Sequence, residues 1–538
     1  MVSEKETSLA KIEYTYDKAG NLAEEKQKEK DSRYSYDKTG NLLTEVTAKG
    51  NETKYEYDKN GNIISVTDPL RRKSSYVYDE NGNITSETDA KGGVTSYTYD
   101  EENNQVSEEN PMGEKTHYTY DKAGRLIKAT DGENRSVSYR YDRMDNLTDR
   151  IEAGGSQTKY SYDKQGNLIK EVTPTGRTTR FTYDESGRLT AKINPDKSRI
   201  SYDYDVLGSL VQKKYSDGSK SVVYGYDAAG NRISMSDESG KSNTTYDELG
   251  RVKTFTDAKG QKLSYTYDEY DRINSISYPK GRVVEYTYDS EDNITKVSDN
   301  KGITAEYTHD GAGNILTCSR SDGTKSSYEY DENDNLMKLE NTKEGTLLSS
   351  YEYTYDAADR ITKEVEKKDN KEAVTSFTYD KAGNLTGYTE NSGGKLKKTT
   401  YTYNAAGNRV SVTKSGSETI TVTYNADDQV VSEKNSKTGD KIKYIYDENG
   451  NLTQKKVKGK RTVYEYDIEN RLRSVSQGGQ LLMATTYDGD GNKVFQMSRK
   501  YVAKEGTSGH TELTEGDDEE DEPEPDRAEA AKEGFTIE

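Results

Sequence analysis

The sequence is poor in the residues that build most large globular domains. Its 538 residues include no Trp, one Cys, three His, five Phe and seven Pro. The single cysteine, Cys318, excludes an internal disulfide framework. Leu, Ile, Val and Phe together make up less than a fifth of the chain, and the net charge is −19. By composition alone this would indicate disorder rather than the three or four globular domains that the length suggests.

Other absences narrow the classes of function. The chain has no run of about 18 apolar residues, so we expect no membrane span. The first six residues, Met-Val-Ser-Glu-Lys-Glu, contain no apolar segment that could act as a signal peptide. We therefore expect either a cytoplasmic fragment or a part of a larger protein that is secreted or displayed at the cell surface. The acidic balance disfavours a nucleic-acid partner, which would need a concentrated basic face.

The sequence is instead rich in tyrosine, with 46 residues, and tyrosine belongs to an internal repeat. Residues 55–63 read Tyr-Glu-Tyr-Asp-Lys-Asn-Gly-Asn-Ile, and similar units recur in 23 registers from Asp17 to Asp488. Their spacing is 20 to 22 residues, with three longer steps of 24 or 25 between residues 331 and 404. The residue before the Asp (or Asn) is Tyr in every register except at His309. The third residue after it is Gly in 15 registers and Asn or Asp in eight.

This unit predicts a strand, a tight turn and a second strand. Tyr55 and Tyr57 are two residues apart, so both rings project from one face of an extended chain. Asp58 suits the first position of a type I turn, and Gly61 falls where a three-residue hairpin with a bulge needs positive φ. Gly, Asn and Asp are the residues that tolerate that conformation best. In this register Tyr57 lies opposite Ile63, on the same face.

A second, looser turn lies about half a period away, as in Asp-Pro-Leu-Arg at 68–71 and Asp-Ala-Lys-Gly at 257–260. Two turns per repeat leave two antiparallel strands per repeat, or about 46 strands in all. A disordered chain has no reason to keep Tyr, Asp and a left-handed position in phase. We therefore predict an all-β fold, a spiral antiparallel sheet that forms a shell or an open, solenoid-like wall.

The repeats define three regions of the chain. Residues 1–13 are a polar lead-in, residues 14–500 form the repeat sheet, and residues 501–538 form an acidic tail. Nine carboxylates and no basic residue occur in residues 515–526. Because such a block repels itself, we expect the tail to be disordered.

We predict structural roles for the recurring positions, illustrated by three copies of the unit. They are Tyr55, Tyr57, Asp58, Gly61, Asn62, Ile63, Tyr160, Tyr162, Asp163, Gly166, Leu168, Tyr444, Tyr446, Asp447, Gly450 and Leu452. We predict no catalytic residue, no cofactor and no metal ligand.

Two features that could indicate chemistry have structural explanations. His309 and Cys318 could form a thiol–imidazole pair. In the hairpin register, however, His309 lies opposite Ile315 and we expect Cys318 on the other face. Residues 488–492, Asp-Gly-Asp-Gly-Asn, resemble the start of a calcium loop, but the glycine comes fourth instead of sixth and no Glu follows at the twelfth place. The turn of the repeat accounts for them.

The unit Tyr-x-Tyr-Asp-x-x-Gly-Asn-Leu, repeated at about 21 residues, resembles the YD repeat of the rearrangement-hot-spot (Rhs) family. Related repeats occur in wall-associated proteins, in shell components of insecticidal toxin complexes and in teneurins. The resemblance implies a hollow spiral sheet that encloses a C-terminal effector in polymorphic toxins and serves contact at a cell surface in other members. The family's Asp-Pro-x-Gly-Leu type of boundary does not occur, since the only Asp-Pro is Asp68-Pro69.

These observations favour a protein that is not an enzyme. We expect a structural shell segment of an Rhs-type polymorphic toxin or of a secreted surface protein, which encloses or presents an effector or another protein cargo. The alternative is a cell-surface interaction module that binds carbohydrate, such as a surface glycan, or a partner protein through exposed Tyr, Asn and carboxylate rows.

Overall fold

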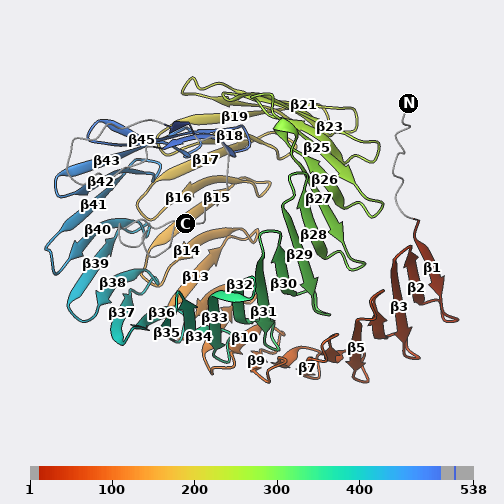
Figure 1. Ribbon diagram of the computed structural model, residues 1–538. Helices are drawn as coiled ribbons and strands as arrows, with labels where there is room; N and C mark the ends of the chain where they lie inside the picture. The colour runs from red at the N-terminus through yellow and green to blue at the C-terminus, as the bar shows by residue number, and fades with distance from the viewer. Residues whose placement is uncertain (1–10, 499–513, 516–538) are drawn as a thin grey trace.

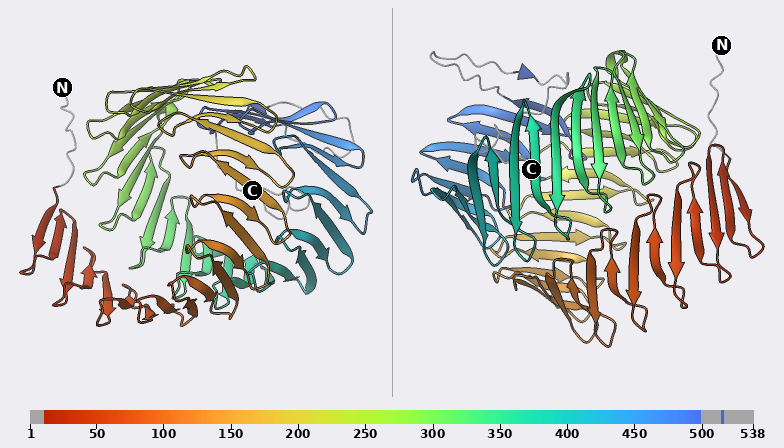
Figure 2. Two further views of the ribbon diagram at one scale, coloured as in Figure 1. Left: turned by 180° about the vertical axis from the view of Figure 1, so that it is seen from behind. Right: turned by 60° about the horizontal axis from the view of Figure 1, so that its bottom comes forward.

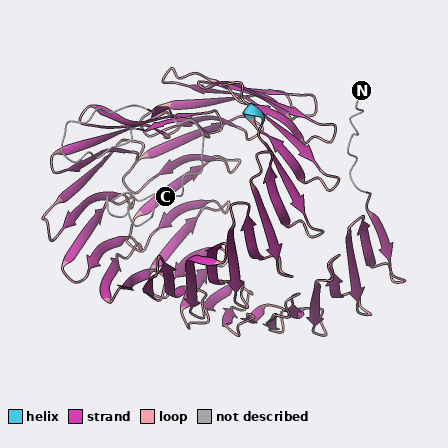
Figure 3. Ribbon diagram, in the orientation of Figure 1, coloured by secondary structure: helices cyan, strands magenta, loops and turns pink. Residues whose placement is uncertain are grey.

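The computed structural model describes residues 11–498 and 514–515, and one continuous antiparallel sheet accounts for nearly all of them (Figure 1; Figure 3). Strands β1–β46 run from Glu13 to Ser498, and β47 pairs with β46. Within the described ranges the only helical element is one 3₁₀ turn, η1 (Pro279–Gly281), and none is long and apolar enough to cross a membrane. The predicted all-β fold is confirmed. The expected lead-in and acidic tail lie largely outside the described residues.

The strands form two windings of the sheet. The first winding consists of β1 Glu13–Tyr16, β2 Leu22–Gln27, β3 Lys30–Tyr36, β4 Leu42–Val46, β5 Glu52–Tyr57, β6 Ile63–Thr67, β7 Lys73–Tyr78, β8 Ile84–Thr88, β9 Val94–Tyr99, β10 Gln105–Glu109, β11 Lys115–Tyr120, β12 Leu126–Thr130, β13 Ser136–Tyr141, β14 Leu147–Ile151, β15 Gln157–Tyr162, β16 Leu168–Val172, β17 Thr178–Tyr183, β18 Leu189–Ile193, β19 Arg199–Tyr204, β20 Leu210–Tyr215, β21 Val222–Tyr226, β22 Arg232–Asp237, β23 Gly240–Tyr246 and β24 Val252–Thr256. The second consists of β25 Lys262–Tyr267, β26 Ile273–Ser277, β27 Val283–Tyr288, β28 Ile294–Asp299, β29 Thr304–His309, β30 Ile315–Arg320, β31 Thr324–Tyr330, β32 Leu336–Lys343, β33 Thr346–Tyr355, β34 Ile361–Lys368, β35 Lys371–Tyr379, β36 Leu385–Ser392, β37 Lys395–Tyr403, β38 Arg409–Lys414, β39 Glu418–Tyr424, β40 Val430–Asn435, β41 Lys441–Tyr446, β42 Leu452–Val457, β43 Lys460–Tyr466, β44 Leu472–Gln477, β45 Gln480–Tyr487 and β46 Lys493–Ser498, followed by β47 Thr514–Glu515.

Each YD turn, as we call the turn after Tyr-Asp, closes a hairpin with a bulge. Tyr57 pairs with Ile63 and Tyr55 with Val66, so the strand after the turn carries one extra residue. The Asp58 carboxylate accepts hydrogen bonds from the backbone N–H of Asn60 at 2.8 Å and of Asn62 at 2.9 Å. Gly61 has φ of 87°, and the third residue after the Asp (or Asn) has positive φ in all 23 registers. Backbone geometry therefore explains why this column contains only Gly, Asn and Asp.

The two kinds of turn lie on opposite edges of the sheet, because consecutive strands alternate in direction. Between repeats, β6 pairs with β7 only through residues 65–67 and 73–75, next to the looser turn. Towards the YD edge, neighbouring hairpins therefore lack a continuous backbone ladder between them.

In most repeats the tyrosine just before the Asp spans this gap. The Tyr78 hydroxyl donates to the backbone oxygen of Ile63, in the preceding repeat, at 2.7 Å. Among the described residues there are 16 such bonds, from the corresponding tyrosine of one repeat to the strand that precedes it, with lengths of 2.6 to 3.0 Å. Side-chain hydroxyls thus replace backbone pairing where the strands separate.

The wall is one sheet thick and has almost no core. Among the described residues only nine apolar side chains are buried, and one cluster, Val222, Tyr224 and Met235, forms a compact group. The sheet coils widely, and the second winding lies beside the first (Figure 1; Figure 2). The three longer repeats give longer strands, β32–β37, of eight to ten residues.

We predict that Gly61→Val destabilises the hairpin by about 1–3 kcal/mol, because a β-branched residue tolerates positive φ poorly. Lys59→Val, in the same turn at an exposed position without positive φ, should change stability little. Chemical unfolding, together with amide exchange in residues 55–66, measures both effects. Equal losses in the two variants would contradict this account of the turn.

We predict that Tyr78→Phe costs about 1 kcal/mol, because it leaves the Ile63 carbonyl without its side-chain donor. Tyr76→Phe is the matched control. Tyr76 lies on the same strand and face, and its hydroxyl makes no hydrogen bond to any described residue. Amide exchange across β6 and β7 should accelerate in the first variant only, and similar acceleration in both would refute the proposed tie.

Candidate functional site

The candidate functional site is the seam between the two windings, because it joins a coiled ribbon into a wall. The looser turns of the first winding meet the YD turns of the second along this line. Its hydrogen bonds join residues that are between 235 and 276 positions apart in the sequence. We use the word seam for these contacts, from Lys28 at one end to Phe495 at the other.

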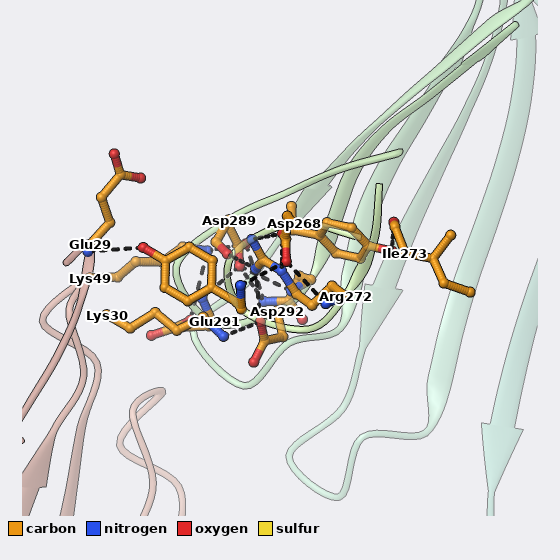
Figure 4. A network of polar contacts seen from close by, with 12 residues as sticks. Glu29, Lys30, Lys49, Asp268, Arg272, Ile273, Asp289, Glu291 and Asp292 are labelled. Atoms are coloured by element: carbon orange, nitrogen blue, oxygen red, sulfur yellow. Dashed lines mark hydrogen bonds and ion pairs between the residues drawn. The ribbon is translucent and has the colours of Figure 1, made fainter. Parts of the chain in front are cut away.

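At its start the seam is a network of ion pairs (Figure 4). Lys28 pairs with Glu269, and Lys30 pairs with Asp292. The backbone N–H of Glu29 donates to the Tyr270 hydroxyl at 3.1 Å. A two-residue turn of the first winding is thus held by the YD turns that follow β25 and β27.

The carboxylates that the second winding presents to the first are also held by hydrogen bonds within the second winding. Arg272 donates to Asp268 at 2.8 Å, to the backbone oxygen of Asp289 at 3.0 Å and to Asp292 at 2.8 Å, and its guanidinium stacks 4.5 Å from the Tyr288 ring centre. Partial burial raises the pKa of Asp289, but hydrogen bonds from Lys49 and from the backbone outweigh it and hold that pKa below its usual value. The Asp289 carboxylate therefore remains charged beside Lys49.

The same chemistry continues along the seam. Lys91 of the first winding lies 2.8 Å from Asp331 and 3.0 Å from Asp359. One turn further, Arg360 of the second winding lies 3.0 Å from Glu114. Since several pairs are partly buried and share partners, they form a network and not isolated surface pairs.

In its middle the seam brings backbones together. A Cβ atom on Gly132 would lie 2.2 Å from the backbone oxygen of Lys381, so no other residue fits there without a shift. Further along, Asp427 accepts from the backbone N–H of Thr175 at 2.9 Å and pairs with Arg177. The Asp427 side chain is only 5% exposed.

The seam ends on the small apolar cluster. A Cβ on Gly489, in the last YD turn, would lie 2.3 Å from Val222. The Tyr224 hydroxyl donates to the backbone oxygen of Gly489 at 3.2 Å, and the Gly489 N–H donates to Asp237 at 2.6 Å. The last YD turn of the second winding therefore packs Gly489 directly against the apolar cluster of the first winding.

The three copies of the repeat unit occupy different places relative to this seam. In each copy the second tyrosine lies opposite the aliphatic residue, as with Tyr162 and Leu168, and Tyr446 and Leu452. The copies at 55–63 and 160–168 lie on the free YD edge of the first winding. The copy at 444–452 belongs to the second winding, and its Gly450 carbonyl accepts from Gln429 at 2.8 Å, next to Arg177.

The predicted face of Cys318 is wrong. Cys318 pairs with Tyr307 while His309 pairs with Ile315, so all four side chains lie on one face. The bulge inserts the extra residue Leu316, which reverses the alternation after the turn. Cys318 is buried against Tyr307, and no hydrogen bond joins it to His309 among the described residues.

The calcium-like residues of the last turn are engaged within the protein. Asp490 forms a bidentate pair with Arg232, with distances of 2.8 and 2.5 Å. Asp488 accepts from the backbone of Asp490 and from Asn492, as in the other YD turns. These oxygens hold the turn and the seam.

Sequence reasoning missed the seam, although the turns carry a signal for it. In the first winding the residue after the Asp is Lys in five YD turns, at positions 18, 38, 59, 122 and 164. In the second winding Lys381 is the only such lysine, and six of the eleven positions hold small residues, Ser290, Gly311, Ala357, Ala405, Ala426 and Gly489, against Ala228 alone in the first winding. The difference separates an exposed edge from a packed one.

Comparison with known families agrees with this architecture. The family model described as Teneurin YD-shell matches residues 2–88, 87–224 and 344–502, together more than half of the chain. The model described as RHS Repeat matches residues 246–283. No curated protein matches the sequence.

Two solved structures share the fold. The Tc holotoxin pore of Photorhabdus luminescens has a TM-score of 0.73 and 13% identity, covering 92% of this chain and 30% of its own. The crystal structure of TcdB2-TccC3-Cdc42 has a TM-score of 0.60 and 15% identity, covering 95% of this chain and 32% of its own. The chain thus spans about a third of the length of these solved chains. The matched model, the repeated YD hairpin and the coiled one-layer sheet together show that the chain belongs to the Teneurin YD-shell family.

Proposed function

We propose that the chain is a structural wall segment of a shell that encloses or presents a protein cargo, without catalysis of its own. The seam is the observation that carries this proposal. A coiled ribbon with open gaps between its windings would not exclude a protease, whereas these windings are joined by ion pairs, backbone contacts and a small apolar cluster.

The recurring positions fit a wall and not a reaction centre. We infer that Tyr55, Tyr57 and Ile63 cover the sheet, while Asp58 and Gly61 turn it. The shell-repeat family and the fold are structural, in agreement with a protein that is not an enzyme.

The relatives support a cargo. One solved structure is described as TcdB2-TccC3-Cdc42, and this name lists Cdc42 as a third protein after TcdB2 and TccC3. Because this chain spans about a third of such proteins, a complete shell would need further wall, and the cargo would be a C-terminal effector or another protein. We infer that the chain acts as part of a larger protein that is secreted or displayed at the cell surface.

The carbohydrate-binding alternative has less support. It needs tyrosines whose hydroxyls are free to bind a sugar. In the second tyrosine column, however, hydroxyls such as those of Tyr78, Tyr183 and Tyr446 donate to backbone carbonyls of the preceding repeat. Glycan binding that is lost on changing exposed tyrosines would favour this alternative over the wall.

The proposal predicts that the wall resists proteases only while the seam is closed. The folded chain is treated with a low concentration of chymotrypsin, and cleavage within the wall is followed over time. Cleavage should be slow in the wild-type chain. Asp427→Lys should accelerate it by at least about tenfold, because a lysine beside Arg177 breaks a buried pair and opens the seam.

Glu102→Lys is the matched control, since Glu102 holds the same place in a YD turn but lies exposed on the free edge. It should leave cleavage slow. Circular dichroism and thermal unfolding show that each variant is folded. Cleavage of the wild-type wall at the rate of the denatured chain would overturn the proposal.

A further inference from the structure

The looser-turn edge of the second winding presents a row of unmatched positive charge. We call it the basic rim. Its exposed cationic side chains are Lys368, Lys371, Lys395, Lys414, Lys437, Lys441, Lys458, Lys460 and Arg461. Lys458 pairs with Asp440 at 2.8 Å. For the other eight, no ion pair with a carboxylate of the described residues exists.

The first winding shows what this edge binds. Its looser turns carry Lys28, Lys49, Lys91 and Arg177, and each of them pairs with a carboxylate of the winding beside it. The basic rim is the continuation of the same edge, with the same cationic chemistry. On the second winding, however, no third winding supplies the carboxylates.

The acidic block, residues 515–526, begins beside this edge. β46 runs from the YD turn at 488–491 towards the looser-turn edge and ends there at Ser498. β47 pairs with it, Glu515 opposite Met497 and Thr514 opposite Ser498. The backbone of Glu515 therefore lies two residues from the looser-turn edge. Because β47 runs antiparallel to β46, the block has to turn back after Glu515 to meet that edge.

The block is long enough to follow the rim. Twelve residues span at most about 40 Å when extended. Successive looser turns are two strands apart, or about 10 Å. With about three residues used to turn back, the other nine span at most about 30 Å, so the block can reach the turns of β42–β43 and β40–β41, which carry Lys460, Arg461, Lys437 and Lys441.

We propose that the acidic block docks along the basic rim and supplies the carboxylates that a further winding would otherwise provide. Each exposed pair is weak, but the block is tethered at Glu515, so its effective concentration at the rim is high and many pairs act together. The docked block neutralises the rim and keeps it from binding foreign polyanions such as nucleic acid or sulfated glycans.

Zero-length carbodiimide cross-linking of the full chain tests the contact. Cross-links should join residues 515–526 to Lys437, Lys441 and Lys460. Lysines of the free YD edge of the first winding, Lys38, Lys59 and Lys122, are the control and should form few. In 1 M salt the rim cross-links should fall by about tenfold, since screening then acts within about 3 Å. In a mixture of isotopically labelled and unlabelled chains they should remain within one chain.

A second measurement tests the consequence with heparin as the probe. A variant with the carboxylates of residues 515–526 changed to amides should be retained on heparin at higher salt than the wild type. Adding Lys437→Glu, Lys441→Glu and Lys460→Glu should abolish that gain, whereas Lys38→Glu, Lys59→Glu and Lys122→Glu should not. Cross-links spread evenly over both edges, cross-links between chains, or unchanged heparin retention would overturn the proposal.

Discussion

The left-handed residue three positions after each Asp is the constraint on which the rest of the structure depends. It lets a three-residue turn close with a bulge, and the bulge places the tyrosine and the following aliphatic residue on one face, as with Tyr57 and Ile63. Bulges also increase local twist. A bulged hairpin in every repeat therefore supplies both the covered face of the sheet and the curvature that winds it.

Tyrosine replaces the core that this composition cannot provide. A wall one sheet thick has no opposing layer, so a side chain on it must cover apolar surface and also satisfy its polar end. Tyrosine does both, since its ring lies over the sheet while its hydroxyl reaches a backbone carbonyl that has no strand partner. Where the windings meet, burial goes further and raises the pKa of Tyr202 to about 12. The low aliphatic content is thus compatible with order, because many shared hydrogen bonds stand in for thick packing.

The strands, their register and the positive-φ column could be predicted because each depends on residues within one repeat. The face of Cys318 could not be derived by simple alternation, since one bulge residue, Leu316, reverses it. The seam was out of reach for a different reason. Whether Asp427 meets Arg177 depends on the twist accumulated over about 250 residues, and a small change of twist per strand would shift every contact. Only the loss of lysine and the gain of small residues at the later turn tips indicate that packing.

The two unlike edges also fix how such a wall can grow. The seam always joins a looser-turn edge to a YD edge, so the contact is heterologous and leaves one edge of each kind exposed at the two ends. The exposed YD edge of the first winding carries lysines such as Lys38, Lys59 and Lys122, together with an apolar tip at Val206, fully exposed, and Leu207, 80% exposed, while the other end carries the basic rim. The two exposed edges therefore differ in turn and in side chains, and each fits a different neighbour. Carboxylates fit the basic rim. Each repeat has a YD turn at one edge and a looser turn at the other, and this difference determines which residues lie exposed at the two ends of the wall.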